Sequence, residues 1–184
     1  MRPLGSRAAL AAAAAAAWMM TLGACATMNV SSFVQRGVTF TQYRTFTWAP
    51  AEQLSTGDPR LDNNEFFEAR VRGAVERGLA AKGLELVERG AADLQLHYHA
   101  SISQRVDAGG ADRQYGYTDE DSAPSVFDAG TLTLDAVETA TNRLVWRGWA
   151  DGAFAGMVDR QDLFEKQIDT AVARILERFP VNLR

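Results

Sequence analysis

The sequence predicts an α+β fold, a two-layer sandwich in which a mainly antiparallel sheet of about five strands packs two helices on one face. Two segments show the apolar spacing of a helix, and several segments alternate in polarity as half-buried strands do. The predicted order is β-α-β-β-β-β-α. Strands that bury one face against helices and leave a polar face outward are typical of such mixed two-layer sheets.

Each helix is predicted from an apolar stripe and from its end signals. The first helix is expected to open at Asp62 and to stop at Gly83, which suits the left-handed conformation that ends many helices. Its apolar face consists of Phe67, Val71, Ala74, Val75, Gly78 and Leu79. The second helix is predicted over residues 159–179, with the stripe Phe164, Ile168, Ala171, Val172, Ile175 and Phe179.

The strands are predicted from alternation and from β-branched and aromatic residues. They cover residues 45–49, 84–88, 93–106, 126–138 and 143–154, and the last two form a hairpin around a tight turn. A stretch rich in Gly, Asp and Ser, residues 107–125, is predicted to be a loop between strands. No internal repeat is evident, and residues 37–184 are expected to form a single α+β domain.

Residues 1–24 carry the features of a targeting segment. Arg2 and Arg7 precede an apolar, alanine-rich run, and small residues stand directly before Cys25. The tetrapeptide Leu22-Gly23-Ala24-Cys25 resembles the bacterial lipoprotein box. The resemblance implies a cleaved signal peptide, a diacylglycerol on the Cys25 sulfur and usually another acyl chain, such as palmitate, on the new amino group. Two alternatives are an uncleaved anchor, for which the apolar run is short against the ~20 residues that span a bilayer, and a secretory signal with an incidental cysteine.

The predicted mature chain starts at Cys25. Residues 1–24 contain two arginines and no acidic residue, so their removal leaves 160 residues with 17 basic and 23 acidic side chains, a net charge of −6. Residues 25–36 are interpreted as a lipidated tether, and Ala26–Gln35 alternatively as a first strand. In the lipoprotein class that this sequence resembles, Ala26 in place of Asp after the cysteine favours the periplasmic face of the outer membrane.

Composition excludes several classes of function. One cysteine cannot form an intramolecular disulfide or supply the thiolates of a Cys-rich zinc site. A net charge of −4 for the whole chain offers no basic surface for nucleic acid. The expected partners are membrane lipid, through acylated Cys25, and another envelope protein.

A set of motifs along the mature chain carries a family resemblance. These are the lipoprotein box, Tyr43-Arg-Thr-Phe-Thr-Trp48, Leu79-Ala-Ala-Lys-Gly83, Ala92-Asp-Leu-Gln-Leu-His-Tyr-His99, the hairpin from Gly130-Thr-Leu-Thr-Leu-Asp135 to Thr141-Asn-Arg-Leu-Val-Trp-Arg-Gly148, and Ile175-Leu-Glu-Arg-Phe-Pro180. Together they resemble the DUF4136 (domain of unknown function) family of bacterial lipoproteins. The resemblance implies the fold and an envelope location, and it carries over no catalytic residue and no cofactor.

His97 and His99 are the candidate metal ligands. Two histidines at i and i+2 on a strand project from one face, a spacing that metal sites use. The third ligand would be Asp135 or the acidic loop Asp119-Glu120-Asp121. The alternative is that both histidines simply occupy the wet face of a half-exposed strand, as Gln95 and Ser101 on the same face suggest.

Trp146 and Trp149 are expected on opposite faces of their strand. Trp146 is predicted in the core, and Trp149 on the outer face beside Arg147, where an exposed aromatic ring could mark a partner or glycan surface. Alternatively, Trp149 lies under a loop or is turned inward by a bulge near Gly148.

No sequence motif indicates catalysis. The chain has neither a Gly-x-Ser-x-Gly elbow nor an HExxH helix, so an enzyme is not expected. The leading hypothesis is a membrane-anchored envelope lipoprotein with a non-enzymatic interaction or structural role. The second is a metal- or small-molecule-binding periplasmic lipoprotein that uses His97 and His99, and the third is a hydrolase.

Overall fold

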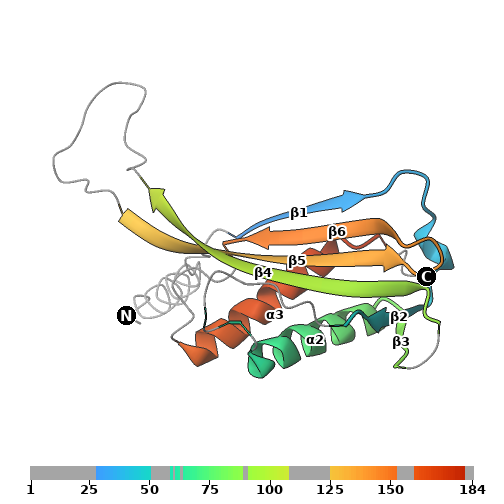
Figure 1. Ribbon diagram of the computed structural model, residues 1–184, viewed down its shortest axis with the longest axis horizontal. Helices are drawn as coiled ribbons and strands as arrows, with labels where there is room; N and C mark the ends of the chain where they lie inside the picture. The colour runs from blue at the N-terminus through green and yellow to red at the C-terminus, as the bar shows by residue number, and fades with distance from the viewer. Residues whose placement is uncertain are drawn as a thin grey trace, which may run out of the picture.

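The computed structural model describes residues 28–50, 59, 61–62, 64–88, 91–107, 125–152 and 160–180. The predicted signal peptide, Cys25 and the acidic loop at residues 119–121 lie outside these ranges. Two helices cover one face of a six-stranded sheet, which confirms the predicted two-layer α+β fold (Figure 1).

The sheet has the strand order β1-β6-β5-β4-β2-β3. The strands are β1 (Asn29–Val34), β2 (Thr45–Trp48), β3 (Glu85–Leu86), β4 (Leu94–Asp107), β5 (Ser125–Glu138) and β6 (Arg143–Asp151). The helices are α2 (Glu65–Ala80) and α3 (Gln161–Glu177), and a short 3-10 helix, η2, covers Phe40–Gln42. β1, β6, β5 and β4 pair antiparallel, whereas β2 is parallel to both β4 and β3.

The sixth strand comes from the segment that was expected to be a tether. β1 pairs with β6 from Asn29 opposite Asp151 to Val34 opposite Trp146. Of the two interpretations of Ala26–Gln35, the first strand is therefore the right one, and the sheet begins at residue 29, not after residue 36. The strand is short and exposed on almost every residue, because it lies at the edge of the sheet.

The start of α2 differs from the prediction, whereas its end agrees with it. Asn64, not Asp62, is the N-cap, and its side-chain oxygen accepts a hydrogen bond from the Phe67 N–H at 3.0 Å. Gly83 has a φ of 82°, and the amide of Leu84 donates to the carbonyl of Leu79. This is the hydrogen-bond pattern of a helix that ends on a left-handed glycine.

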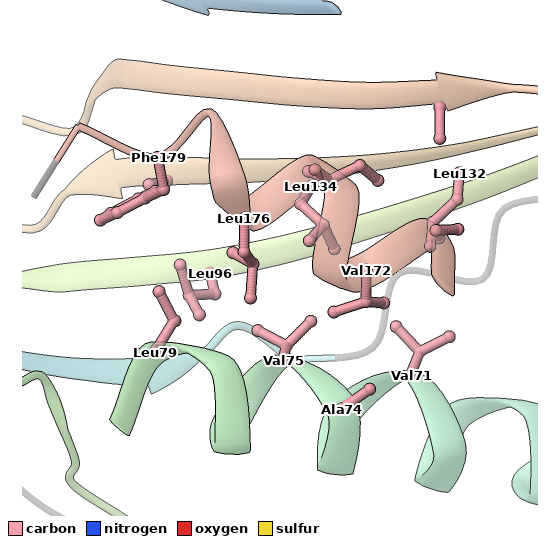
Figure 2. Close-up of a cluster of buried hydrophobic side chains, with 14 of the residues drawn as sticks. Val71, Ala74, Val75, Leu79, Leu96, Leu132, Leu134, Val172, Leu176 and Phe179 are labelled. Atoms are coloured by element: carbon pink, nitrogen blue, oxygen red, sulfur yellow. The ribbon is translucent and has the colours of Figure 1, made fainter. Parts of the chain in front are cut away.

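The core lies between the sheet and the two helices. Every residue of the apolar stripe predicted for α3 is buried. So is every residue of the stripe predicted for α2 apart from Gly78, which has no side chain. Figure 2 shows Val71, Val75 and Leu79 of α2 facing Val172 and Leu176 of α3. The sheet residues Leu96, Leu132 and Leu134 belong to the same cluster. Trp146 is 1% exposed and its ring lies 4.8 Å from that of Phe179, so it belongs to the core as predicted.

The helices run parallel to each other. The rings of Phe67 and Phe164 stack at 5.8 Å near the two N-terminal ends, and Leu176 packs against Gly78 near the C-terminal ends. Arg70 forms an ion pair with Asp169, and its guanidinium lies 3.3 Å from Glu165. Neither helix of the described chain is long and apolar enough to cross a membrane.

Asp93 ties the start of β4 to the start of β2. One of its carboxylate oxygens accepts from the amide of Arg44 at 2.7 Å, the amide of Thr45 at 2.9 Å and the Thr45 hydroxyl at 3.0 Å. The Thr45 hydroxyl oxygen in turn accepts from the Asp93 amide. Hydrogen bonds from the backbone, that of Arg44 first, hold the pKa of Asp93 below its usual value.

Two glycines allow close approach in the core, and they should respond differently to an added methyl group. A Cβ at Gly148 would lie 2.5 Å from the Trp146 ring and 2.6 Å from Ile175, both buried. We expect Gly148→Ala to lower the free energy of unfolding by about 1–3 kcal/mol. In Gly78→Ala the clash at 2.4 Å involves only the tip of Leu176, and the helix gains about 1 kcal/mol of propensity, so the two effects should nearly cancel. Urea unfolding followed by tryptophan fluorescence measures the free energy of unfolding of both variants. Equal losses of stability in the two variants would contradict the different packing of the two glycines.

The Asp93 carboxylate should make stability depend on pH in one direction. Because its pKa is lowered by folding, its contribution is present above about 3.8, the usual pKa of an aspartate, and is lost as the pH falls through the lower folded value. Asp93→Asn should be less stable than the natural protein by about 1 kcal/mol at pH 7, and the difference should vanish in strong acid. Unfolding curves from pH 7 to pH 2 test this, and a difference between the two proteins that stays constant over this range would contradict the prediction.

Candidate functional site

The outer face of the sheet, opposite α2 and α3, is the candidate functional surface. No described helix or strand covers it (Figure 1). The strand register places its side chains in two rows that cross β1, β6, β5 and β4. One row is Phe33, Arg147, Asp135 and His97, and the next is Ser31, Trp149, Thr133 and His99. Residues from four strands, far apart in the sequence, therefore form one continuous surface.

An ion pair stands at the centre of this face. Arg147 donates to both carboxylate oxygens of Asp135, at 2.7 and 2.6 Å, in the parallel two-bond geometry that arginine makes with carboxylates. Asp135 is only 5% exposed and is the one buried polar residue among the described positions, whereas the Arg147 side chain is 46% exposed. The hydrogen bond to Asp135 raises the pKa of Arg147, which is thus a fixed positive charge at the surface.

The two histidines lie on this face as the alternation of β4 predicts. His97 is opposite Asp135 and His99 is opposite Thr133, and the His99 Nε2 atom lies 3.8 Å from Asp135. Asp135 is thus close enough to be the predicted third ligand, but both of its oxygens are bound to Arg147. In the described ranges no group of three or more His, Cys, Asp or Glu residues could hold a metal ion. The other predicted ligands, at residues 119–121, lie outside the described residues.

Trp149 lies on the outer face beside Arg147, as the sequence predicts. The residue between them, Gly148, turns inward against Ile175 of α3, so Trp149 turns outward and is half-buried. The β6 strand does contain an irregularity, but it lies opposite residues 136 and 137 and leaves Val145 unpaired with β5. This is too far along the strand to turn Trp149 inward.

Phe33 is the residue of this face that sequence reasoning missed. It is 46% exposed on β1 and lies opposite Arg147. The segment Ser31-Ser32-Phe33-Val34 gives a signal only if β1 is recognised, because its alternation covers few residues. Phe33, across from Arg147, and Trp149, two residues from Arg147 along β6, therefore place two aromatic side chains next to the arginine of the ion pair.

Two hollows are less suited to a ligand. Next to the end of β2, a depression of about 20 Å³ touches Trp48, Arg72 and Tyr98 and also His97 and His99, and it is large enough for about one water. Trp48 is already engaged, because its indole N–H donates to Glu76 and the Arg72 guanidinium lies 5.0 Å from its ring centre. An open groove of about 490 Å³ runs between α2 and α3, and its charged walls are two basic and two acidic residues, Arg77, Lys82, Asp169 and Glu177. Such a balance favours neither an anion nor a cation.

The Asp135–Arg147 pair should contribute to stability mainly by neutralising a buried carboxylate. Arg147→Leu leaves that carboxylate without its partner, and we expect a loss of about 1–3 kcal/mol in the free energy of unfolding. The double variant Asp135→Leu/Arg147→Leu should recover most of the loss, because two apolar side chains can replace such a pair. Arg143→Leu, on the same strand and exposed, is the control and should change stability by less than about 0.5 kcal/mol. If Arg147→Leu behaves like the control, the pair does not stabilise the fold.

Of three similar solved structures, the first supports the fold. A PDZ domain protein from Parabacteroides distasonis is 16% identical with a TM-score of 0.57; the match covers 86% of this chain and 37% of that protein. PelC from Paraburkholderia phytofirmans, solved as a dodecamer, is 11% identical over 85% of this chain and 100% of that one, with a TM-score of 0.48. A DUF4136 family protein from Bacteroides thetaiotaomicron is 14% identical over 78% of this chain and 92% of that one, with a TM-score of 0.45.

No curated protein matches the chain in sequence. The family profile described as a domain of unknown function, DUF4136, matches residues 30–181, and this range runs from β1 to the end of α3. The range includes the whole outer face and the edge strand that sequence analysis placed ahead of the domain. The chain therefore belongs to the DUF4136 family.

Proposed function

We propose that the protein is a membrane-anchored lipoprotein of the bacterial cell envelope, and that its domain is a non-enzymatic interaction module. The anchor would be acylated Cys25, on the periplasmic face of the outer membrane. The partner would be another envelope protein, bound on the outer face of the sheet. The observation that carries the proposal is this open face, with two partly exposed aromatic side chains, Phe33 and Trp149, next to a fixed arginine.

The chemistry of the face supports protein binding. Tryptophan, phenylalanine and arginine are enriched at protein interfaces, where they supply most of the binding energy. Arg147 is already oriented by Asp135, so a partner would bind it with little loss of side-chain freedom. Hydroxyl groups of Ser31 and Thr133 beside Trp149 can make the polar contacts of an interface rim.

The same face argues against a hydrolase. His99 has a carboxylate near it, but that carboxylate is held by Arg147 on both oxygens. An acid that orients a catalytic histidine must bind the imidazole itself. The described histidines therefore fit a half-exposed strand surface better than a catalytic set.

The anchor can be tested by removing the cysteine. Cys25→Ala should lose incorporation of a radiolabelled fatty acid, and the protein should no longer fractionate with membranes, because two or more acyl chains are needed for stable anchoring. Thr27→Ala, two residues further on, is the matched control and should retain both properties. An unlabelled natural protein whose electrophoretic mobility matches that of Cys25→Ala would refute lipidation.

The interaction surface can be tested by crosslinking from chosen positions. A photoreactive amino acid at Phe33 or Trp149 should give discrete adducts in the native envelope, and mass spectrometry would identify the partner. The same amino acid at Leu86, which is 40% exposed and lies on the far edge strand β3, is the control and should give none of these adducts.

A further substitution separates specific binding from chance proximity. Arg147→Glu should remove the adducts formed from position 33, because it puts a like charge beside Asp135 and reverses the charge that the partner meets. Adducts that are the same from all three positions, or that survive Arg147→Glu unchanged, would contradict the proposed surface.

A further inference from the structure

We propose that the N-terminal ends of α2 and α3 rest on the lipid surface and that Phe66 and Leu163 enter its headgroup region. The proposal rests on the lipidation of Cys25 proposed above. It concerns how the domain is oriented on the membrane, which the lipid anchor alone does not determine.

Only a short stretch of chain joins the lipid to the domain. Two residues, Ala26 and Thr27, separate Cys25 from Met28. Even fully extended, the chain from Cys25 to Met28 spans about 10 Å. Met28 is buried in the core cluster, and its carbonyl accepts a hydrogen bond from the Arg174 guanidinium at 3.3 Å. The start of the domain is therefore fixed to its own core and held within about 10 Å of the bilayer surface.

The start of β1 and the N-terminal ends of the two helices lie toward one end of the domain. β1 begins at Asn29, opposite the last residue of β6, Asp151. Helix α3 runs antiparallel to β6, since Phe179 packs on Trp146 and Ile175 on Gly148. The N-terminal end of α3 therefore lies toward the Asp151 end of the sheet, where β1 starts, and α2 runs parallel to α3 (Figure 1).

Two exposed apolar side chains lie at this end of the domain. Phe66 is 44% exposed and Leu163 is 38% exposed, and each lies in the first turn of its helix. Their chain neighbours, Phe67 and Phe164, stack on each other, so the two first turns are adjacent. An aromatic and an aliphatic side chain exposed together next to an acylated end are suited to the membrane interface.

The charge of these turns indicates which lipid they would meet. Glu65 and Glu68 begin α2, and Asp162 begins α3, where acidic side chains stabilise the helix dipole. An anionic surface would repel them, whereas a zwitterionic surface would not. We therefore commit to zwitterionic headgroups as the surface that contacts Phe66 and Leu163.

The experiment uses the full-length lipidated protein in phosphatidylethanolamine–phosphatidylcholine vesicles. Cys25 is the only cysteine and its sulfur carries the lipid, so an introduced cysteine is the single free thiol. A polarity-sensitive fluorophore is attached to Phe66→Cys or Leu163→Cys, and to Leu86→Cys as the control. Leu86 is exposed to a similar degree, but it lies at the other end of the sheet, since it is opposite Phe46 and thus near the start of β4.

We expect a blue shift of the emission at positions 66 and 163, and quenching by doxyl-labelled lipid several-fold stronger than at position 86. Labels at Glu65→Cys and Asp162→Cys, which keep both apolar side chains, should show the same contrast if the first pair of variants folds poorly. Quenching at positions 65, 66, 162 and 163 no greater than at position 86 would overturn the proposal.

The failure of this proposal is distinct from the failure of the proposed function. Flotation with vesicles and the acyl mass on the N-terminal peptide report lipidation directly. A protein that carries no lipid refutes the anchor and this orientation with it. A protein that floats but shows uniform quenching refutes the orientation alone.

Discussion

The close approach of α3 to strand β6 at Gly148 is the contact on which the rest of the structure depends. A side chain at this position would collide with Trp146 and Ile175, so the absence of one sets the distance between the two layers. The same glycine lies between Arg147 and Trp149, which the alternation of the strand places on the outer face. One position therefore connects the buried layer of the domain with the surface that we propose to be its binding face.

Much of the fold could be predicted because its signals are local. The helical stripes ending at Leu79 and Phe179, the left-handed stop at Gly83 and the inward position of Trp146 each follow from spacing within a few residues. Local spacing does not predict the parallel pairing of β2 with β4 or the membership of β1 in the sheet. They depend on contacts between segments far apart in the chain, and β1 is too short and exposed to show clear alternation.

The candidate site could be predicted in part for the same reason. Alternation places His97 and His99 together on one face and Trp149 beside Arg147. What alternation does not predict is that Arg147 binds both oxygens of Asp135, because that depends on the register between two strands. Because of this register, Asp135 orients an exposed arginine and is not free to act as the metal ligand that the sequence suggested.

The pairing of β1 with β6 has a consequence for how the chain folds as it emerges. The two strands join residue 29 to residue 151, so the first strand to appear finds its partner only after most of the chain has followed. Contacts of such long sequence separation slow folding, because the intervening chain must be ordered first. Until β6 has formed, β1 therefore lacks its partner strand, and the start of the domain joins the sheet late.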